Sequence, residues 1–299
     1  MTTIVLGASG QLANHLQQQL PQAAFWGRAT VDISDPTRLH EALLDAAPRA
    51  IVNAAAYTAV DKAEQEPELA WRMNAEAPAA AARAAATLGA TIVQVSTDYV
   101  FDGRATVPYT EDAPVNPLGV YGASKLGGEL AVRTLCPRHW ILRTSWVFSE
   151  HGANFVKTML RLATGGRPLR IVADQQGQPT YAGDLAALIG ALDGTGAETA
   201  LPFGTYHATG GPVVSWHGFA ARIVERAAGI GLLENPVRVD PIATAEYPTP
   251  AQRPTYGALR PSAALTEVVG AGFDWQAGLE TALAAIAKAT AATQASPTP

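Results

Sequence analysis

The chain has 299 residues, of which 21 are Lys or Arg and 26 are Asp or Glu, so its formal net charge is −5. This balance argues against a protein that holds nucleic acid on a basic surface. The content of 48% hydrophobic and 16% charged residues is typical of a globular protein with one large or two modest domains. The single cysteine, Cys136, excludes an internal disulfide and favours a reducing compartment.

The beginning of the chain does not resemble a secretory signal, because it has no basic stretch followed by a long apolar core. The longest mostly apolar stretch, Ala75–Val95, contains Glu76, Pro78 and Arg83 and is not expected to cross a bilayer. The six histidines show no i, i+4 ligand pair, and Walker-type and Gly-x-Ser-x-Gly motifs do not occur. We therefore expect a cytoplasmic protein with no metal site and with neither a membrane nor a nucleic-acid partner.

Apolar runs of strand length alternate with helical patterns through the first half of the chain. The strand-like runs are continuously apolar, so helices should cover both faces of the sheet that they form. This pattern predicts an α/β fold with a doubly wound, Rossmann-like parallel sheet. The predicted strands are Thr3–Leu6, Ala23–Trp26, Ala50–Ala54 and Thr91–Val95, and the helical patterns between them are Leu12–Leu20, Leu39–Leu44 and Ala77–Leu88.

A glycine motif, Gly7–Ala13, directly follows the first predicted strand and opens the first helix. Gly7 allows a tight turn, Gly10 lets the backbone approach a pyrophosphate, and the helix N-terminus offers unpaired N–H groups to the phosphates. This context favours a dinucleotide site over an ordinary glycine turn. The candidate cofactor contacts are Gly7, Ser9, Gly10, Gln11 and Leu12.

Arg28 and Asp32, which both follow the second predicted strand, give conflicting indications about the cofactor. The cation Arg28 favours the ribose phosphate of NADPH, whereas the acid Asp32 lies at about the offset that favours a ribose hydroxyl. We predict NADPH, with NADH tolerated. The small residues after the third strand either let a cofactor lie close to the backbone or themselves pack tightly in the core. The candidate contacts here are Arg28, Asp32, Ile33, Asn53, Ala54 and Ala55.

The fourth strand ends in two hydroxyl residues, Ser96 and Thr97, at the edge of the sheet where α/β proteins bind ligands. Either could donate to a substrate carbonyl, but side chains alternate along a strand, so only one is expected to face the site. Tyr57, Thr58 and Val60 follow the third strand at the same edge and are further contact candidates. The charged stretch that begins at Asp61 is interpreted as a solvated helix face.

A Pro-, Asp- and Gly-rich segment over 101–118 is typical of a loop above a binding site. A predicted helix over 119–135 and a strand over 140–146 follow it. Tyr121 and Lys125 lie one turn apart on one face of that helix. A neighbouring ammonium lowers the pKa of a phenol, so Lys125 is expected to tune Tyr121 as a general acid and to hold a ribose hydroxyl.

These observations suggest two domains. A dinucleotide-binding domain is placed at 1–150, and the pattern allows a later segment near 205–235 to return to it. Residues 151–292 are predicted to form a smaller, discontinuous lobe that mainly binds substrate. The polar end, 293–299, is predicted to be a disordered tail.

Several motifs occur together and in order in this chain. They are Gly7–Leu12, Asn53–Glu64, Met73–Asn74, Ser96–Gly103, Tyr121–Glu129, Arg143–Phe148, Asp174–Thr180 and Arg253–Pro254. This series resembles the dTDP-4-dehydrorhamnose reductases, which are extended short-chain dehydrogenases. The match runs from Ile4 to about Pro254 and so covers most of the chain.

The resemblance implies reduction of the 4-keto group of dTDP-4-dehydro-L-rhamnose, the last step of dTDP-L-rhamnose synthesis. It implies that Tyr121 protonates the alkoxide, that Lys125 lowers the Tyr121 pKa and binds ribose, and that Thr97 rather than Ser96 orients the carbonyl. The resemblance also implies that Ser96 and Tyr57 lie near the cofactor and that Tyr57 lies near the sugar as well. The implied substrate contacts are Thr58, Val60, Asp98, Tyr99 and Trp146 near the sugar, and Asn154, Lys157, Gln178 and Arg253 near the nucleotide or its diphosphate.

Two positions depart from the family pattern. Some members are dimers that a magnesium ion holds on acidic residues, one of them just after the glycine motif, but this chain has Asn14 and His15 there. We therefore do not expect a magnesium-bridged dimer, and expect a monomer or a weak homodimer. The usual Ser three residues after Arg-Pro is Gly257, which removes a hydroxyl from a loop near the substrate.

Two alternative functions remain open on the sequence alone. The first is another nucleotide-sugar reductase or an epimerase on the same fold. The second is a non-catalytic, cofactor-binding subunit, because the regulatory subunit of methionine adenosyltransferase resembles the same family. Intact Thr97, Tyr121 and Lys125 favour the reductase.

Overall fold

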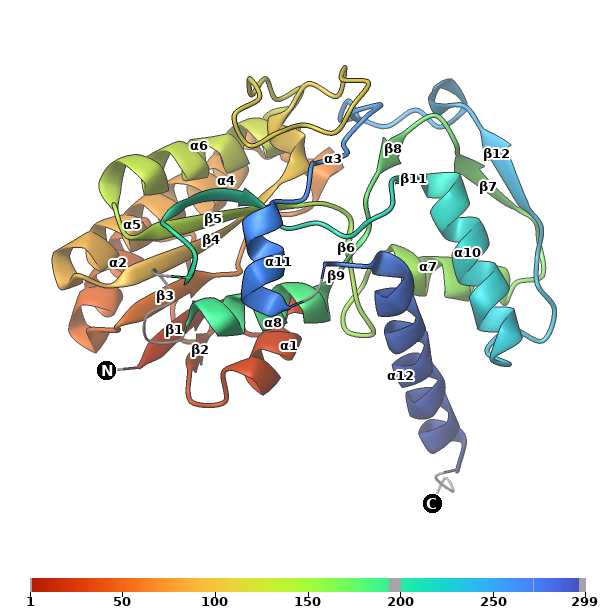
Figure 1. Cartoon of the computed structure of the whole chain (residues 1–299), viewed down its shortest axis with the longest axis horizontal. Helices are drawn as coiled ribbons and strands as arrows, with labels where there is room; N and C mark the ends of the chain where they lie inside the picture. The colour runs from red at the N-terminus through yellow and green to blue at the C-terminus, as the bar shows by residue number, and fades with distance from the viewer. Residues whose placement is uncertain (1, 194–199, 271, 296–299) are drawn as a thin grey trace.

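Six short strands form one parallel sheet at the centre of the larger lobe. The computed structural model describes residues 2–193, 200–270 and 272–295, and Figure 1 shows the whole chain. Every pair of neighbouring strands in this sheet is parallel, which confirms the predicted α/β fold. In spatial order the strands are β10 (Gly204–His207), β5 (His139–Thr144), β4 (Thr91–Thr97), β3 (Ala50–Asn53), β1 (Thr3–Leu6) and β2 (Ala24–Trp26).

Helices cover both faces of the sheet, as the continuously apolar strands require. On β1, Ile4 and Leu6 pack in one buried cluster, while Val5 between them packs in the cluster on the opposite face. The first face is covered by α2 (Pro36–Ala46), α5 (Ala77–Leu88) and α6 (Val120–Leu135), and the second by α1 (Gln11–Gln19), α8 (Ala182–Leu192) and α11 (Ala263–Val269).

Short elements connect the sheet to its helices on the side of the strand carboxyl ends. A π-helical turn joins α4 directly to α5, so the chain is helical from Pro67 to Leu88. These elements are α3 (Val60–Ala63), α4 (Pro67–Trp71), the π-helical η1 (Arg72–Glu76) and the 3-10 turn η2 (Asp98–Val100).

A second lobe, on the right of Figure 1, has its own buried core. Aromatic residues from three elements form its centre: Phe148, Phe219 and Trp275. Its helices are α7 (Phe155–Ala163), α10 (Trp216–Gly229) and α12 (Trp275–Ala295), with the 3-10 turn η3 (Thr244–Glu246) at its edge. Its strand pairs are β7 (Leu169–Val172) with β12 (Val239–Ile242), β6 (Val147–Phe148) with β9 (Thr180–Tyr181), and β8 (Gln176–Gly177) with β11 (Val214–Ser215).

The chain crosses between the lobes more often than the sequence suggested. Of the segment near 205–235, β10 joins the central sheet beside β5, but α10 packs in the second lobe. In the opposite direction, α8 and α11 come from the 151–292 segment and pack on the sheet. The predicted disordered tail is wrong for its first three residues, because α12 continues to Ala295. Residues 296–299 lie outside the described part of the chain.

None of the helices in the described ranges is both long enough and apolar enough to cross a bilayer.

Deleting side-chain atoms at the centre of the sheet should cost stability. Ile51 on β3 is 0% exposed and packs among Ile4, Leu39 and Ile92. We expect Ile51→Ala to lower the free energy of unfolding by about 2–5 kcal/mol, because it removes buried contacts and leaves a cavity. Chemical denaturation measures the change. Val107→Ala, at a side chain 62% exposed, is the control and should change the free energy by no more than about 0.5 kcal/mol; equal losses would contradict the assignment of the core.

Candidate active site

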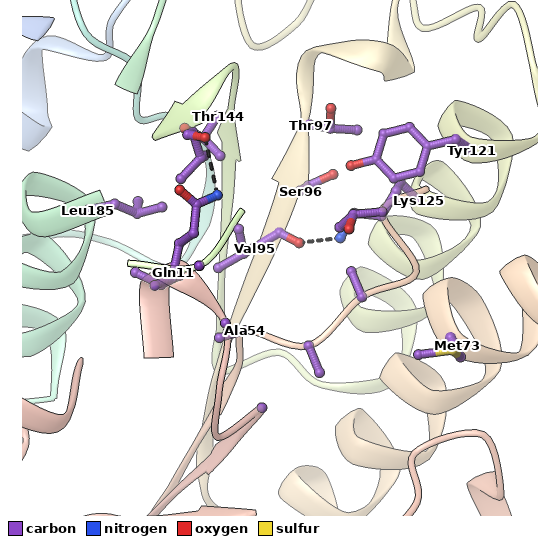
Figure 2. A pocket seen from close by; sticks show the side chains of 18 of the residues that line it. Gln11, Ala54, Met73, Val95, Ser96, Thr97, Tyr121, Lys125, Thr144 and Leu185 are labelled. Atoms are coloured by element: carbon purple, nitrogen blue, oxygen red, sulfur yellow. Dashed lines mark hydrogen bonds between the residues drawn. The ribbon is translucent and has the colours of Figure 1, made fainter. Parts of the chain in front are cut away.

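A crevice of about 940 Å³ lies at the carboxyl ends of the central strands, between the two lobes (Figure 2). Ligands of open parallel sheets bind in this position. Most of the predicted site residues line it together. They are Gly7, Ser9, Gly10, Gln11, Leu12, Arg28, Asp32, Ile33, Ala54, Ala55, Thr58, Val60, Ser96, Thr97, Asp98, Tyr99, Tyr121, Lys125, Trp146 and Arg253.

The glycine motif forms one end of the crevice. Gly7 has a φ of 102°, and a Cβ there would lie 3.3 Å from the backbone nitrogen of Ala55, so only glycine suits the turn. Gly10 is the N-cap of α1 and provides no side chain to cap it. Gly10, Gln11 and Leu12 line the crevice, so the uncapped N-terminus of α1 lies where it can bind an anionic phosphate.

Arg28 and Asp32, which gave conflicting predictions, both lie at this end of the crevice. The Asp32 carboxylate accepts a hydrogen bond of 2.9 Å from the backbone N–H of Ser34. This bond is the main reason that the pKa of Asp32 lies below its usual value, and the nearby Arg28 charge lowers it further. The Arg28 charge thus acts on a carboxylate that the local turn holds in place.

Tyr121 and Lys125 reach the crevice from the first turns of α6. The Glu64 carboxylate accepts a 2.8 Å hydrogen bond from the N–H of Val120 and so caps this helix from a distant segment. Gly122 permits close packing, because a Cβ there would lie 2.1 Å from the carbonyl oxygen of Tyr99. The start of α6 is therefore pressed against η2, next to the end of β4.

The ammonium group of Lys125 is buried and donates a 2.6 Å hydrogen bond to the carbonyl oxygen of Val95 (Figure 2). Burial lowers the pKa of Lys125 to about 8, while the negative charge of Glu129 acts in the opposite direction.

The pKa of Tyr121 differs from the sequence expectation. Burial raises it above the usual value, and a hydrogen bond with Thr97 opposes that shift only in part. The Lys125 ammonium is bonded to the backbone rather than to the phenol. Tyr121 is therefore a neutral phenol that can donate a proton, and its pKa is raised overall rather than lowered as the sequence predicted.

The two hydroxyls at the end of β4 have different partners. Ser96 donates a 2.6 Å hydrogen bond to Glu129, which is itself paired with Arg143 at 2.7 Å inside the protein. Thr97 donates to the Asp98 carboxylate at 3.0 Å and lies within hydrogen-bond reach of Tyr121. Both residues line the crevice, but the Ser96 hydroxyl is engaged by a buried ion pair and the Thr97 hydroxyl is beside the phenol (Figure 2).

Asp98 is a buried carboxylate with one unused oxygen. Asp98 is 2% exposed, and its Oδ2 has no hydrogen-bond partner among the described residues. Burial raises the pKa of Asp98 to about 7, although the Thr97 hydroxyl acts against the shift. Gly257 lies against it, and a Cβ at that position would be 2.5 Å from Oδ2. Gly257 therefore leaves space for this carboxylate.

An aromatic residue and an arginine form the far end of the crevice. Trp146 stacks on Trp216 of the second lobe with ring centroids 3.5 Å apart, and it both lines the crevice and packs against the core of that lobe. Arg253 donates to Asp61 at 2.6 Å and to the Tyr99 hydroxyl at 3.1 Å. The interpretation of the charged stretch at Asp61 as a solvated face is therefore wrong for Asp61 and for Glu64, which both make long-range contacts.

Five predicted site residues do not line this crevice. Asn53 and Gln178 use their amides within the protein, with Gln94 and Thr209 respectively. The Tyr57 hydroxyl donates to Glu66, while Asn154 caps α7 and Lys157 donates to the Glu150 carbonyl. The residues that sequence reasoning missed include Met73, Thr144, Ser145, Gly152, Leu185 and Trp216.

The raised pKa of Asp98 should make stability depend on pH. The pKa of Asp98 is about 7 in the folded protein, and the reference value of 3.8 applies to the unfolded chain. Between about pH 4 and pH 7 the folded protein therefore binds more protons than the unfolded chain. The contribution of Asp98 to stability therefore falls as pH rises through this window, by at most about 4 kcal/mol.

Asp98→Asn removes this titration and should flatten the stability profile between about pH 4 and pH 7. Urea denaturation at several pH values measures the difference between variant and wild type. Asp45→Asn, at an exposed position, controls for the change in net charge. A difference that does not change with pH would contradict the proposed protonation of Asp98.

Comparisons with known proteins agree with this geometry. A family model described as RmlD substrate binding domain matches residues 1–288. The dTDP-4-dehydrorhamnose reductase of Aggregatibacter actinomycetemcomitans is 42% identical over 287 residues, which cover 93% of this chain and 96% of that protein. The corresponding enzyme of Escherichia coli K12 is 39% identical, and the match covers 94% of this chain and 96% of that protein.

Solved structures give the same result. The dTDP-4-dehydrorhamnose reductase of Clostridium acetobutylicum superposes with a TM-score of 0.87 at 37% identity and covers 96% of this chain and 100% of that one. The dTDP-4-dehydrorhamnose reductase of Bacillus anthracis, solved in complex with NADP, has a TM-score of 0.85 at 35% identity. The match covers 95% of this chain and 100% of that one. These matches confirm the resemblance inferred from the ordered motifs. The chain belongs to the RmlD substrate-binding-domain family, which includes the dTDP-4-dehydrorhamnose reductases.

Proposed function

We propose that this protein uses NADPH to reduce the 4-keto group of dTDP-4-dehydro-L-rhamnose, giving dTDP-L-rhamnose. The observation that carries the proposal is the meeting of Thr97 and the protonated phenol of Tyr121 in the same crevice as the glycine motif. The crevice is continuous from the helix N-terminus that suits a pyrophosphate to the far end at Trp146 and Arg253. The relative from Bacillus anthracis, which was solved with NADP, supports the choice of cofactor.

The residues present fit a dinucleotide and a sugar nucleotide. Gly7 and Gly10 leave room for a pyrophosphate, and Arg28 provides a cation at the ribose-phosphate end. Arg253, held by Asp61 and Tyr99, provides a second cation that suits the diphosphate of a nucleotide sugar. The remaining predicted contacts, Asn53, Tyr57, Asn154, Lys157 and Gln178, act in this scheme through the elements that they hold in place.

NADPH supplies the hydride that reduces the carbonyl carbon. Thr97 donates a hydrogen bond to the carbonyl oxygen, and Tyr121 gives its phenolic proton to that oxygen as negative charge develops there. Lys125, which is charged below a pKa of about 8, places a positive charge next to the phenolate that forms and holds the nicotinamide ribose. The phenolate then recovers a proton from solvent.

We further propose that the enzyme works in the cytoplasm as a monomer or a weak homodimer and takes neither nucleic acid nor a membrane as a partner. The net charge of −5 and the single cysteine support this.

The direct test is the decay of NADPH absorbance with enzymatically prepared dTDP-4-dehydro-L-rhamnose, beside NADH and beside a reaction without sugar. We expect rapid, sugar-dependent decay that is faster with NADPH. Cofactor binding without net oxidation would contradict the reductase and favour an epimerase or a regulatory subunit.

Removing the proton donor should abolish turnover and leave binding intact. We expect Tyr121→Phe to lower kcat by about 10²- to 10⁴-fold, because the variant cannot protonate the alkoxide, with little change in the Kd for NADPH. Stopped-flow kinetics and fluorescence titration measure the two quantities. Tyr247→Phe, at a side chain 61% exposed, is the matched control, and a Tyr121→Phe variant as fast as this control would remove Tyr121 from proton transfer.

Removing the cation at the ribose end should change the cofactor preference. We expect Arg28→Ala to raise the KM for NADPH by about 10- to 100-fold, which corresponds to the loss of a charge-assisted hydrogen bond to phosphate. The KM for NADH should stay nearly constant, since NADH lacks that phosphate. Parallel losses with both cofactors would show that Arg28 does not select between them.

A further inference from the structure

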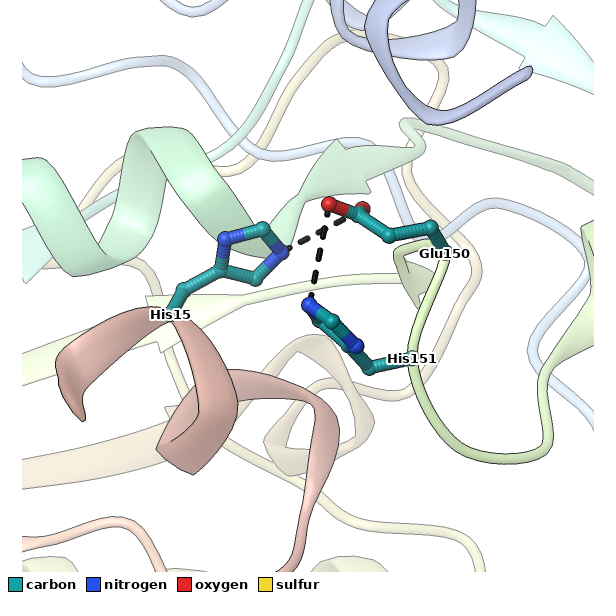
Figure 3. Close-up of side chains that lie close together, drawn as sticks. All are labelled: His15, Glu150 and His151. Atoms are coloured by element: carbon teal, nitrogen blue, oxygen red, sulfur yellow. Dashed lines mark ion pairs between the residues drawn. The ribbon is translucent and has the colours of Figure 1, made fainter. Parts of the chain in front are cut away.

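Three metal-ligand side chains gather beside the crevice, outside the residues used in the reaction. His15 comes from the second turn of α1, while Glu150 and His151 come from the loop between β6 and α7 (Figure 3). The Nε2 atom of His15 lies 3.4 Å from Oε2 of Glu150, and Nε2 of His151 lies 3.7 Å from Oε1. One ligand atom from each residue lies within 4.8 Å of the other two.

The Nε2 atoms of the two histidines lack a hydrogen-bond partner among the described residues. His15 is 6% exposed, and its Nε2 atom, like that of His151, is buried with no hydrogen bond among the described residues. Both nitrogen–oxygen distances exceed the range of about 2.7–3.2 Å for N–H···O bonds. A buried nitrogen without a partner is unfavourable, so these atoms point to a ligand placed between them.

The spacing suits a metal ion. Tetrahedral zinc with bonds of about 2.0–2.1 Å places neighbouring ligand atoms about 3.3 Å apart. The observed 3.4 and 3.7 Å, which run from the two histidines to different carboxylate oxygens of Glu150, are close to this value, and one ligand atom from each residue lies within 4.8 Å of the other two. Two imidazoles and one carboxylate are typical ligands of zinc and neighbouring transition metals, while magnesium prefers oxygen ligands.

We propose that His15, Glu150 and His151 form a binding site for one divalent transition-metal ion of the zinc type, with the fourth coordination position left to water. The inference is independent of the proposed reductase reaction. The sequence predicted no metal site because no two histidines are spaced for ligation along one helix. The ligands proposed here come instead from a helix and a distant loop.

The surroundings of the cluster agree with this site. The Tyr181 hydroxyl donates to both carboxylate oxygens of Glu150, at 3.2 and 3.4 Å, and so orients the ligand from outside the coordination sphere. The His151 side chain is 34% exposed, which provides a path from solvent for the ion.

The position of the cluster indicates what the metal would do. Gln11, one turn before His15, lines the crevice, and a Cβ at Gly152, next to His151, would lie 3.3 Å from Cγ of Gln11. Gly152 and Ala153 also line the crevice. A bound ion therefore fixes this loop to α1 at the wall of the crevice, without contact with the reacting atoms.

The test is calorimetric titration of the metal-free, full-length protein with Zn²⁺, beside Co²⁺ as a visible-absorption probe and beside Mg²⁺. We expect one Zn²⁺ per chain, four-coordinate absorption bands with Co²⁺, a higher Tm with Zn²⁺ and no response to Mg²⁺. His151→Ala, at a partly exposed residue that can be removed without disturbing the core, should weaken Zn²⁺ binding by more than about 100-fold, and His15→Asn should do the same. Tyr181→Phe should weaken it by about 10-fold.

His217→Ala is the matched control, because this histidine is also partly exposed but its ring contacts the carbonyl of Val239. It should bind Zn²⁺ as the wild type does. The proposal is overturned if the wild type binds no Zn²⁺, if His15→Asn and His151→Ala bind it as tightly as the His217→Ala control, or if Mg²⁺ binds equally well.

Discussion

The crevice depends on one buried ion pair. Arg143 on β5 makes a bidentate contact with Glu129 on α6, with bonds of 3.0 and 2.7 Å, and both side chains are at most 2% exposed. Ser96 on β4 donates to the same carboxylate, so one group joins two strands to the helix. Because Glu129 lies one turn after Lys125 and two turns after Tyr121, this pair fixes the rotation of α6 that presents both residues. Removing one partner of such a pair costs about 3–5 kcal/mol.

Burial explains the electrostatics of the site as a whole. The same loss of solvation raises the pKa of Asp98 to about 7, raises that of Tyr121 and lowers that of Lys125 to about 8. Each shift favours the neutral form, so burial keeps the proton on Tyr121 and favours a proton on Asp98. Negative charge that develops on a substrate oxygen therefore meets a proton donor and a nearby cation in a weakly screened environment.

Local patterns predicted the parts of the fold that local interactions determine. The strand, glycine turn and helix at Gly7 follow from backbone geometry, and the continuously apolar strands imply helices on both faces. The roles of polar residues were harder to predict, because a position at the edge of the sheet does not reveal which group the side chain hydrogen-bonds to. Asn53 has the predicted place but bonds to Gln94, and Glu64 was interpreted as solvated but caps α6. Thr144 could have been found, since β5 is adjacent to β4, whereas Trp216 carried no local signal.

Trp146 shows why the second lobe is needed. Its φ of 47° places it in the left-handed region, at a cost of about 1–2 kcal/mol for a residue with a side chain. The second lobe offsets this cost, because Trp216 stacks on one face of the ring and Gly177 leaves it space, with a Cβ position only 2.6 Å from the ring. Both supporting residues lie outside the central sheet. The sheet can thus position the proton donor, but the aromatic wall opposite depends on contacts that form only when the two lobes pack together.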